Sequence, residues 1–313
     1  MTNFQVYKKT LSFSLVKFAL DLGLLVLLIG LPVGALFLFK NVVAPIVAFV
    51  IALVAVILLN IFVGNRIKAA QIAMMTKGCT EGDLPEHTFH EGFEVVKKRF
   101  ASLTLFFMIT NAIKGTFRQL GRTITRFGSA IGGEIGGSVT STIDSIIQTL
   151  IQYLCDCCLG WVFYRSDVNM AKAACEGAAI FFKHGKTLAK NMGRIFGMGL
   201  LSLLVVGGAF FGIFFLIFNS NPAMFNELIK IINEGSSSPI DPEGTVVFTI
   251  VFSAFLAIVL WGILHSVFVS PFILTGVLRN FLASGKEDIP SESEFNEIAQ
   301  KSSRFRKLQE RME

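Results

Sequence analysis

Four long apolar runs dominate the pattern of hydrophobic and polar positions along the chain. They cover Leu11 to Phe39, Val42 to Val63, Ile195 to Phe218 and Thr245 to Leu278. A helix that rises 1.5 Å per residue needs about 20 apolar residues to cross roughly 30 Å of hydrocarbon, and each run is at least that long. The pattern predicts an all-α, polytopic integral membrane protein: a helical bundle of four spans, with amphipathic interfacial helices between them.

The first run could be mistaken for a cleaved signal peptide, because Lys8 and Lys9 precede it. It is too long for the apolar part of a signal, it lacks a small-x-small cleavage site, and a second run follows at once. We therefore expect it to stay in the mature protein. The composition agrees with a membrane protein, since 53% of the residues are hydrophobic and only 16% are charged.

Lys and Arg residues near the ends of the runs predict on which side of the membrane each loop lies. Segment 65–99 is rich in Lys and Arg, whereas 219–244 carries four acidic residues against the single Lys230. Because cytoplasmic loops hold the excess of Lys and Arg, we expect both termini in the cytoplasm.

The chain is expected to divide into six segments. They are a transmembrane hairpin (1–64), a cytoplasmic basic segment (65–99), a region with a short apolar segment, a basic helix, a Gly-rich row and a Cys cluster (100–164), a cytoplasmic amphipathic helix (165–194), a transmembrane pair with an external acidic loop at 219–244 (195–278), and a cytoplasmic charged tail (279–313).

The net charge of +6 suggests an anionic binding partner, either a nucleic acid or a lipid. The basic residues lie at the ends of spans rather than in a patch interleaved with aromatic residues, so a nucleic acid is not expected. Anionic lipid on the cytoplasmic side is the expected partner.

Segment 100–164 leaves two interpretations open. Its run "FASLTLFFMITNAI" is apolar for about 14 residues, which suits an interfacial or re-entrant segment as well as a tilted helix that would raise the number of spans up to six. The next cations recur every fourth residue, and this spacing puts them on one helical face. We expect this basic stripe to lie on anionic lipid, with a solvated helix face as the alternative; it consists of Lys114, Arg118, Arg122 and Arg126.

A row of small residues follows in "GSAIGGEIGGS", where Gly128, Gly132 and Gly136 recur at every fourth position. Such a row lets two helices pack closely in a membrane, within one chain or between copies in a homo-oligomer. A flexible glycine loop would use the same letters, because Gly weakens a helix. Both interpretations stay open.

Residues with catalytic or metal-binding chemistry form no recognisable constellation. Cys155, Cys157 and Cys158 in "CDCC" lack the paired spacing of a zinc site, and they are expected to be small apolar residues near an interface, with S-palmitoylation as the alternative. His87 and His90 lack a third ligand of fixed geometry. There is no P-loop, Rossmann or Gly-x-Ser-x-Gly motif, so we expect no enzyme activity, no metal and no cofactor.

The order of features from about Lys98 to the end resembles the C-terminal half of the choline transporter-like family. The resemblance rests on "FASLTLFFMI", the Cys cluster "YLCDCCLGW", the Ala-rich helix "NMAKAACEGAAIFFKHGKTLAKN", the Gly-rich run "IFGMGLLSLLVVGGAFFGIFF" and the last span "IVLWGILHSVFVSPFILTGVLRNFL". It implies a transporter-like protein for a small organic cation of the choline or ethanolamine type, or for another polar metabolite. That family has more spans than this chain has room for, so either the first hairpin is organised differently here or one helix does not cross the membrane.

A second functional hypothesis rests on the similarity between two segments of the chain. "HEGFEVVKKRFASLTLFF" and "CEGAAIFFKHGKTLAKN" each place an Glu-Gly pair at the start of an amphipathic stretch that leads into an apolar run. A duplication of this kind also suits a non-transport protein that organises or assembles membranes.

Ionisable residues inside the apolar runs are the candidates for function, because charged and polar groups are costly in hydrocarbon. Lys17 and Asp21 are four residues apart and are expected to pair on one helical face. His265 lies near the middle of the fourth run, with Trp261 and Phe268 expected on its face. An aromatic wall could bind an organic cation and the imidazole could relay protons, whereas a purely structural histidine is the alternative.

Overall fold

The computed structural model describes residues 1–39, 41, 43–100, 103–132, 137–189, 192–221 and 242–312. Throughout these residues the secondary structure is helical, with no strand, which confirms the all-α prediction. The chain divides into two compact units. Unit 1 comprises Met1–Phe13, Asn65–Arg194 and Pro271–Glu313, and unit 2 comprises Ser14–Gly64 and Ile195–Ser270.

Unit 2 contains the most apolar parts of the candidate membrane spans. Among the described residues, four helices are long and apolar enough to cross a membrane, which confirms the four predicted spans: Leu11–Phe39, Val43–Thr80, Gly197–Ser220 and Val246–Glu287. Between 6% and 17% of the most apolar window of each is buried by the protein, so most of this surface is available to lipid. The elements are α2 (Leu11–Phe39), α3 (Val43–Leu59), η1 (Asn60–Gly64), α9 (Met192–Ser202), η2 (Leu203–Gly207), α10 (Gly208–Ser220), α12 (Pro242–Leu264) and η3 (His265–Val269).

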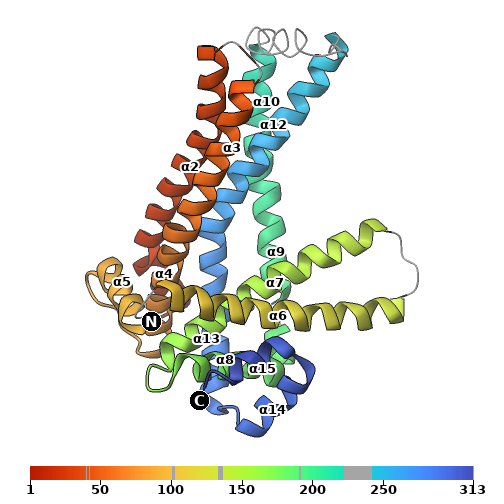
Figure 1. Cartoon of the computed structure of the whole chain (residues 1–313). Helices are drawn as coiled ribbons and strands as arrows, with labels where there is room; N and C mark the ends of the chain where they lie inside the picture. Colours follow the sequence, from red (N-terminus) through yellow and green to blue (C-terminus); the bar gives the residue numbers. More distant parts are fainter. Residues whose placement is uncertain are drawn as a thin grey trace. The chain divides into compact units, whose positions relative to one another are not determined.

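Helices α10 and α12 pack side by side within unit 2 (Figure 1). Phe218 is the buried centre of their contact, and its ring lies 5.5 Å from that of Phe252. Phe214, Phe248 and Leu256 surround it. Aromatic packing thus joins these two spans near the end of α10.

In the described part of unit 2, three π-helical segments interrupt the regular α-helices, namely η1, η2 and η3. A π-turn contains an extra residue, so it changes which side chains share a face and it loosens the local backbone hydrogen bonding. Short π segments of this kind are frequently found at functional sites.

Unit 1 is an assembly of shorter helices with its own core. Helix α4 lies at the centre, since its residues from Ala69 to Thr76 are all buried. Helices α7 and α13 approach closely at two glycines: a Cβ on Gly160 would lie 2.5 Å from Leu278, and one on Gly285 would lie 2.5 Å from Trp161. The elements are α1 (Asn3–Lys9), α4 (Asn65–Thr80), α5 (Thr88–Arg99), α6 (Leu103–Gly132), α7 (Gly137–Tyr164), α8 (Met170–Ala189), α13 (Ser270–Glu287), α14 (Glu292–Lys301) and α15 (Ser303–Gln309).

The structure changes the interpretation of the fourth apolar run. The sequence suggests a span that continues to Leu278, but the residues from Pro271 onward belong to unit 1. Ile273, Leu274 and Leu278 are buried there. These apolar residues therefore build a protein core, and the hydrophobic pattern alone does not separate a core helix from a membrane span.

Helices α6 and α7 pack against each other and fill segment 100–164. Neither is among the helices of membrane-spanning length and apolarity found in the described residues. Whether this segment crosses the membrane or lies at its surface stays a prediction. Helix α6 turns one apolar face toward the core of unit 1, with Phe106, Ile109, Ile113 and Phe117 buried.

The predicted basic stripe and glycine row lie only partly within the described side chains. Arg118 is exposed, as a lipid-facing or solvated stripe requires, whereas Lys114 is half-buried and lines a small cavity beside Asp156. Gly128 and Gly132 belong to α6. The side chains of Arg122 and Arg126, Gly136, and most of the acidic loop at 219–244 lie outside the described residues.

The cysteines of the "CDCC" cluster belong to α7, and Cys158 packs against α8. Cys157 and Cys158 are fully buried, and the thiol of Cys158 donates a hydrogen bond to the carbonyl of Ala174 at 3.4 Å. Burial raises the pKa of both thiols well above the ordinary range, and it raises the pKa of Cys175 to about 12. Inaccessible neutral thiols suit packing, and S-palmitoylation at Cys157 or Cys158 does not fit this burial.

Candidate functional site

A polar cluster joins two spans of unit 2 at Ser202, Trp261 and His265. The indole Nε1 of Trp261 donates a hydrogen bond to the hydroxyl oxygen of Ser202 at 3.1 Å. The Nδ1 atom of His265 lies 3.1 Å from the same oxygen. The Ser202 hydroxyl also donates to the carbonyl of Gly199 at 2.8 Å. One hydroxyl therefore connects both aromatic side chains of the last span with the backbone of the preceding one.

The hydroxyl proton of Ser202 has two competing acceptors. A hydroxyl has one proton and two lone pairs, and Trp261 occupies one lone pair. If Nδ1 of His265 carries a proton, it donates to Ser202, which then donates to Gly199. If Nδ1 is unprotonated, Ser202 can donate to it and release the Gly199 carbonyl. The cluster thus has two hydrogen-bonding arrangements that differ in the protonation of one imidazole nitrogen.

Local helix geometry brings these three residues together. Ser202 directly precedes η2, and His265 is the first residue of η3, so both spans depart from α-helical geometry at the cluster. Gly199 and Gly207 face these rings: a Cβ on Gly199 would lie 3.6 Å from Cε1 of His265, and one on Gly207 would lie 3.7 Å from Cβ and Cγ of Trp261. These are ordinary van der Waals distances, so the glycines lie at the contact of the two spans and the space there would also admit a methyl group.

The aromatic residues that the sequence predicts on one face are divided by the structure. The rings of Trp261 and His265 lie 5.2 Å apart at an interplanar angle of 37°. Phe268 instead pairs with Phe18 of α2, at 5.6 Å between ring centroids. The prediction used α-helical spacing, but His265 to Phe268 lies within η3, where the rotation per residue is smaller.

Ser202 is the member of the cluster that sequence reasoning missed. It lies 63 residues before His265, and no short-range pattern links the two. The available signal was a hydroxyl residue in a glycine-rich apolar run, next to Gly197 and Gly199. Ser266, which adjoins His265, is turned away and donates to the carbonyl of Ile263 in its own helix at 2.9 Å.

Lys17 and Asp21 form the ion pair that their spacing predicts. The Lys17 ammonium lies 2.9 Å and 2.7 Å from the two carboxylate oxygens of Asp21. The side chains of Lys17 and Asp21 are 18% and 12% exposed, so neighbouring residues cover most of both charged groups. Because the ammonium contacts both carboxylate oxygens, the pair reduces the free-energy cost of placing either charge in a low dielectric.

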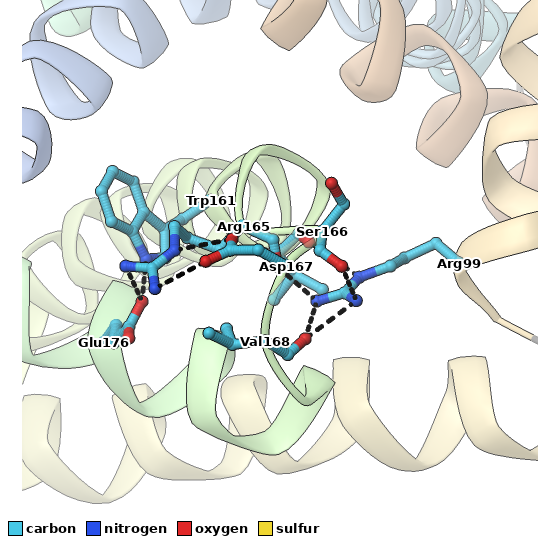
Figure 2. A network of polar contacts seen from close by, with 8 residues as sticks. Arg99, Trp161, Arg165, Ser166, Asp167, Val168 and Glu176 are labelled. Carbon is cyan, nitrogen blue, oxygen red and sulfur yellow. Dashed lines mark hydrogen bonds and ion pairs between the residues drawn. The ribbon is translucent and has the colours of Figure 1, made fainter.

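A second polar network closes the turn between α7 and α8 in unit 1 (Figure 2). Buried Glu176 accepts a hydrogen bond from Nε1 of Trp161 at 2.9 Å and pairs with Arg165 at 3.2 Å. Arg165 also makes two contacts with the carboxylate of Asp167, at 3.0 Å and 3.1 Å. Glu176 thus has a hydrogen-bond donor and an opposite charge beside it, while Nη1 of Arg165 contacts the carboxylate as an ion pair without forming a hydrogen bond. Ion pairs and hydrogen bonds that share members in this way are typical of a structural network.

Arg99 approaches the same turn from the end of α5 (Figure 2). Its guanidinium donates to the carbonyls of Val162, Arg165, Ser166 and Val168 at 2.8–3.4 Å. Burial lowers the pKa of Arg99 and the nearby Asp167 carboxylate opposes this shift. Arg99 thus holds the turn by binding four backbone carbonyls.

Comparisons of the sequence with protein-family models, with curated proteins and with solved structures find no match.

Proposed function

We propose that this protein is a multi-pass membrane carrier for a small organic cation of the choline or ethanolamine type, or for another polar metabolite. The observation that carries the proposal is the polar cluster of Ser202, Trp261 and His265, at which π segments of two spans meet. Polar side chains within spans are costly in lipid, and their concentration at an irregular backbone is typical of a transport pathway.

The aromatic ring of Trp261 is the proposed contact for the cation. Its Nε1 bond to Ser202 orients the indole, and the imidazole of His265 stands 5.2 Å from it. An indole is the best of the side-chain rings for cation–π attraction, which suits a quaternary or primary ammonium group. Within the described spans of unit 2, Asp21 is the carboxylate that would balance such a charge if its pairing with Lys17 opens.

Protonation of His265 would oppose binding of the cation. An imidazolium at this position would place a positive charge next to the indole that the substrate needs, and like charges repel. Uptake of a proton by His265 would therefore favour release of the cation, and release of the proton would favour binding. The two hydrogen-bonding arrangements of Ser202 accommodate both states of the imidazole.

The proposed topology places both termini in the cytoplasm. Both hairpins of spans begin in unit 1 and return to it, and both termini belong to unit 1, which supports a common side for all of them. Segments of unit 1 next to the spans carry Lys and Arg, and such residues favour the cytoplasmic side and anionic lipid.

Saturable uptake of labelled choline or ethanolamine into proteoliposomes tests the proposed function. Trp261→Phe keeps an aromatic face and loses the hydrogen bond, whereas Trp261→Leu loses both. We expect Trp261→Leu to lower the uptake rate by about tenfold or more and Trp261→Phe by less, in accordance with about 1–2 kcal/mol for a desolvated cation–π contact. Absence of saturable uptake of either amine by the correctly folded protein would contradict the proposal for this substrate class.

A protein that organises or assembles membranes is the second candidate. It is favoured by the size of unit 1, which has its own core of buried residues and an amphipathic helix α6. Such a protein would need no substrate pathway, so substitutions of Trp261 would leave its activity unchanged while changes on the exposed face of α6 would impair it.

A further inference from the structure

A cavity in unit 1 collects positive charge without an equal number of carboxylates. Its volume is about 490 Å³, and its walls come from α4, α5, the end of α7 and α13. Lys77, Lys98, Arg99 and Lys286 line it, and among the described lining residues Glu81 is the carboxylate. The cavity lies within one unit and is separate from the residues of the polar cluster.

The cations of this cavity have weak anionic partners in the described part of the chain. Lys77 lies 3.9 Å from Glu91, a long and half-exposed contact. Lys286 stands 4.9 Å above the ring of Tyr164, a contact that supplies no negative charge. Arg99 forms its hydrogen bonds with carbonyls, and the Asp167 carboxylate acts on it only as a neighbouring charge. The local field is therefore positive, and it favours an anion.

The charged and apolar residues that line the cavity indicate the size and chemistry of the anion that it can bind. Arg99 is immobilised by its carbonyl partners, so it provides a charge of fixed position at one side. Lys98 and Lys286 are exposed, so their flexible side chains can reach a group bound in the cavity. Ala73, Met74 and Phe163 supply apolar surface for an organic moiety. A volume of this size exceeds that of an inorganic ion and is usual for a small organic ligand.

We infer that this cavity, lined by Lys77, Lys98, Arg99 and Lys286, binds a phosphate monoester with a compact organic moiety. Ammonium groups bind phosphate as point charges, and charge-assisted hydrogen bonds to phosphate are the strong ones. The phosphate group belongs either to a soluble metabolite or to a lipid headgroup. The site does not depend on the proposed transport of a cation, so either proposal can fail alone.

Titration calorimetry on the purified full-length protein in neutral detergent at low salt tests this inference. Glycerol 3-phosphate is the soluble probe and dioctanoylphosphatidic acid is the lipid probe, with glycerol and dioctanoylglycerol as their uncharged controls. We expect saturable binding of at least one phosphate probe, none of the uncharged ones, and weaker binding as salt rises. Binding of the soluble probe identifies a metabolite site, whereas binding of the lipid probe alone identifies a headgroup site.

Variants with matched losses of charge distinguish binding in this cavity from nonspecific electrostatic binding to the protein surface. Lys98→Gln with Lys286→Gln removes two cations from the cavity, and about tenfold or greater loss of affinity is expected. Lys97→Gln with Lys301→Gln removes the same charge from exposed positions that do not line it, and affinity should change less than about twofold. The inference is overturned if neither phosphate probe binds saturably, or if both double variants lose affinity equally.

Discussion

Glu176 offers a quantitative test of how unit 1 is held together. Its side chain is buried, with 1% of the residue exposed, and it receives the Trp161 indole proton and an ion pair from Arg165. Glu176→Leu would leave the indole N–H without an acceptor in the interior, a loss of about 1–3 kcal/mol, and would remove one carboxylate from Arg165. Glu176→Gln keeps an acceptor for Trp161 and removes only the charge.

The expected destabilisation is about 3 kcal/mol for Glu176→Leu and about 1 kcal/mol for Glu176→Gln. The value for Glu176→Leu is lower than the cost of a fully isolated buried charge, because Arg165 keeps its ion pair with Asp167. The side chain of Asp167 is 65% exposed. For a unit of this size, 1 kcal/mol corresponds to a shift of about 2–4 °C in Tm. Glu176→Leu should therefore lower Tm by about 6–12 °C.

Thermal unfolding followed by Trp fluorescence is the assay. The chain has two tryptophans, so a Trp261→Phe background leaves Trp161 as the reporter of unit 1. Exposed Glu297 provides the control substitution to Gln, with an expected change below about 0.5 kcal/mol. Equal Tm values for Glu176→Leu and Glu176→Gln would refute the reasoning, because the unsatisfied indole would then have no measurable cost.

Three further predictions follow from the same contacts. Burial raises the pKa of Asp156 despite its 2.7 Å contact with Lys68, so its contribution to stability is present below the unfolded pKa of about 4 and is lost as pH rises through the higher folded value. Asp156→Asn should flatten the dependence of Tm on pH above the unfolded pKa of about 4, and an unchanged slope would contradict this. Asp21→Leu should lower the yield of folded protein by stranding the Lys17 ammonium in the span, at about 2.5–3.5 kcal/mol, and replacing Lys17 by Leu as well should restore the yield. Cysteines introduced at Ser237 and at exposed Ser293 in a Cys-free chain should differ in labelling by an impermeant maleimide, with Ser237 labelled from outside intact cells; the reverse result would invert the proposed topology.

The spans could be predicted from the sequence because each depends on one contiguous property, the length of an apolar run. Leu11 to Phe39 coincides with α2 for this reason. The same property misleads after Ser270, where the apolar residues of α13 face the core of unit 1. Local hydrophobicity measures the preference for leaving water, and it does not distinguish lipid from protein as the destination.

The candidate site could be predicted only in part, for a related reason. The ion pair of Lys17 and Asp21 depends on a spacing within one helix and was accessible from the sequence. The partner of His265 lies on another span, and the contact also depends on π segments that no periodicity revealed. The division of the chain into two units likewise depends on contacts between segments that are distant in sequence, such as α4 and α7.

The pH dependence of amine uptake by the His265→Gln variant tests the central claim most directly. Glutamine keeps a hydrogen-bond donor and an acceptor for Ser202 but does not titrate between pH 5 and pH 8, where an ordinary imidazole changes charge. The account predicts that the wild-type protein takes up choline or ethanolamine at a rate that rises with pH through this range, and that His265→Gln transports with a flattened pH profile. A variant that keeps the full rate and an unaltered pH profile would show that His265 is structural and would contradict the proposed coupling of proton and cation.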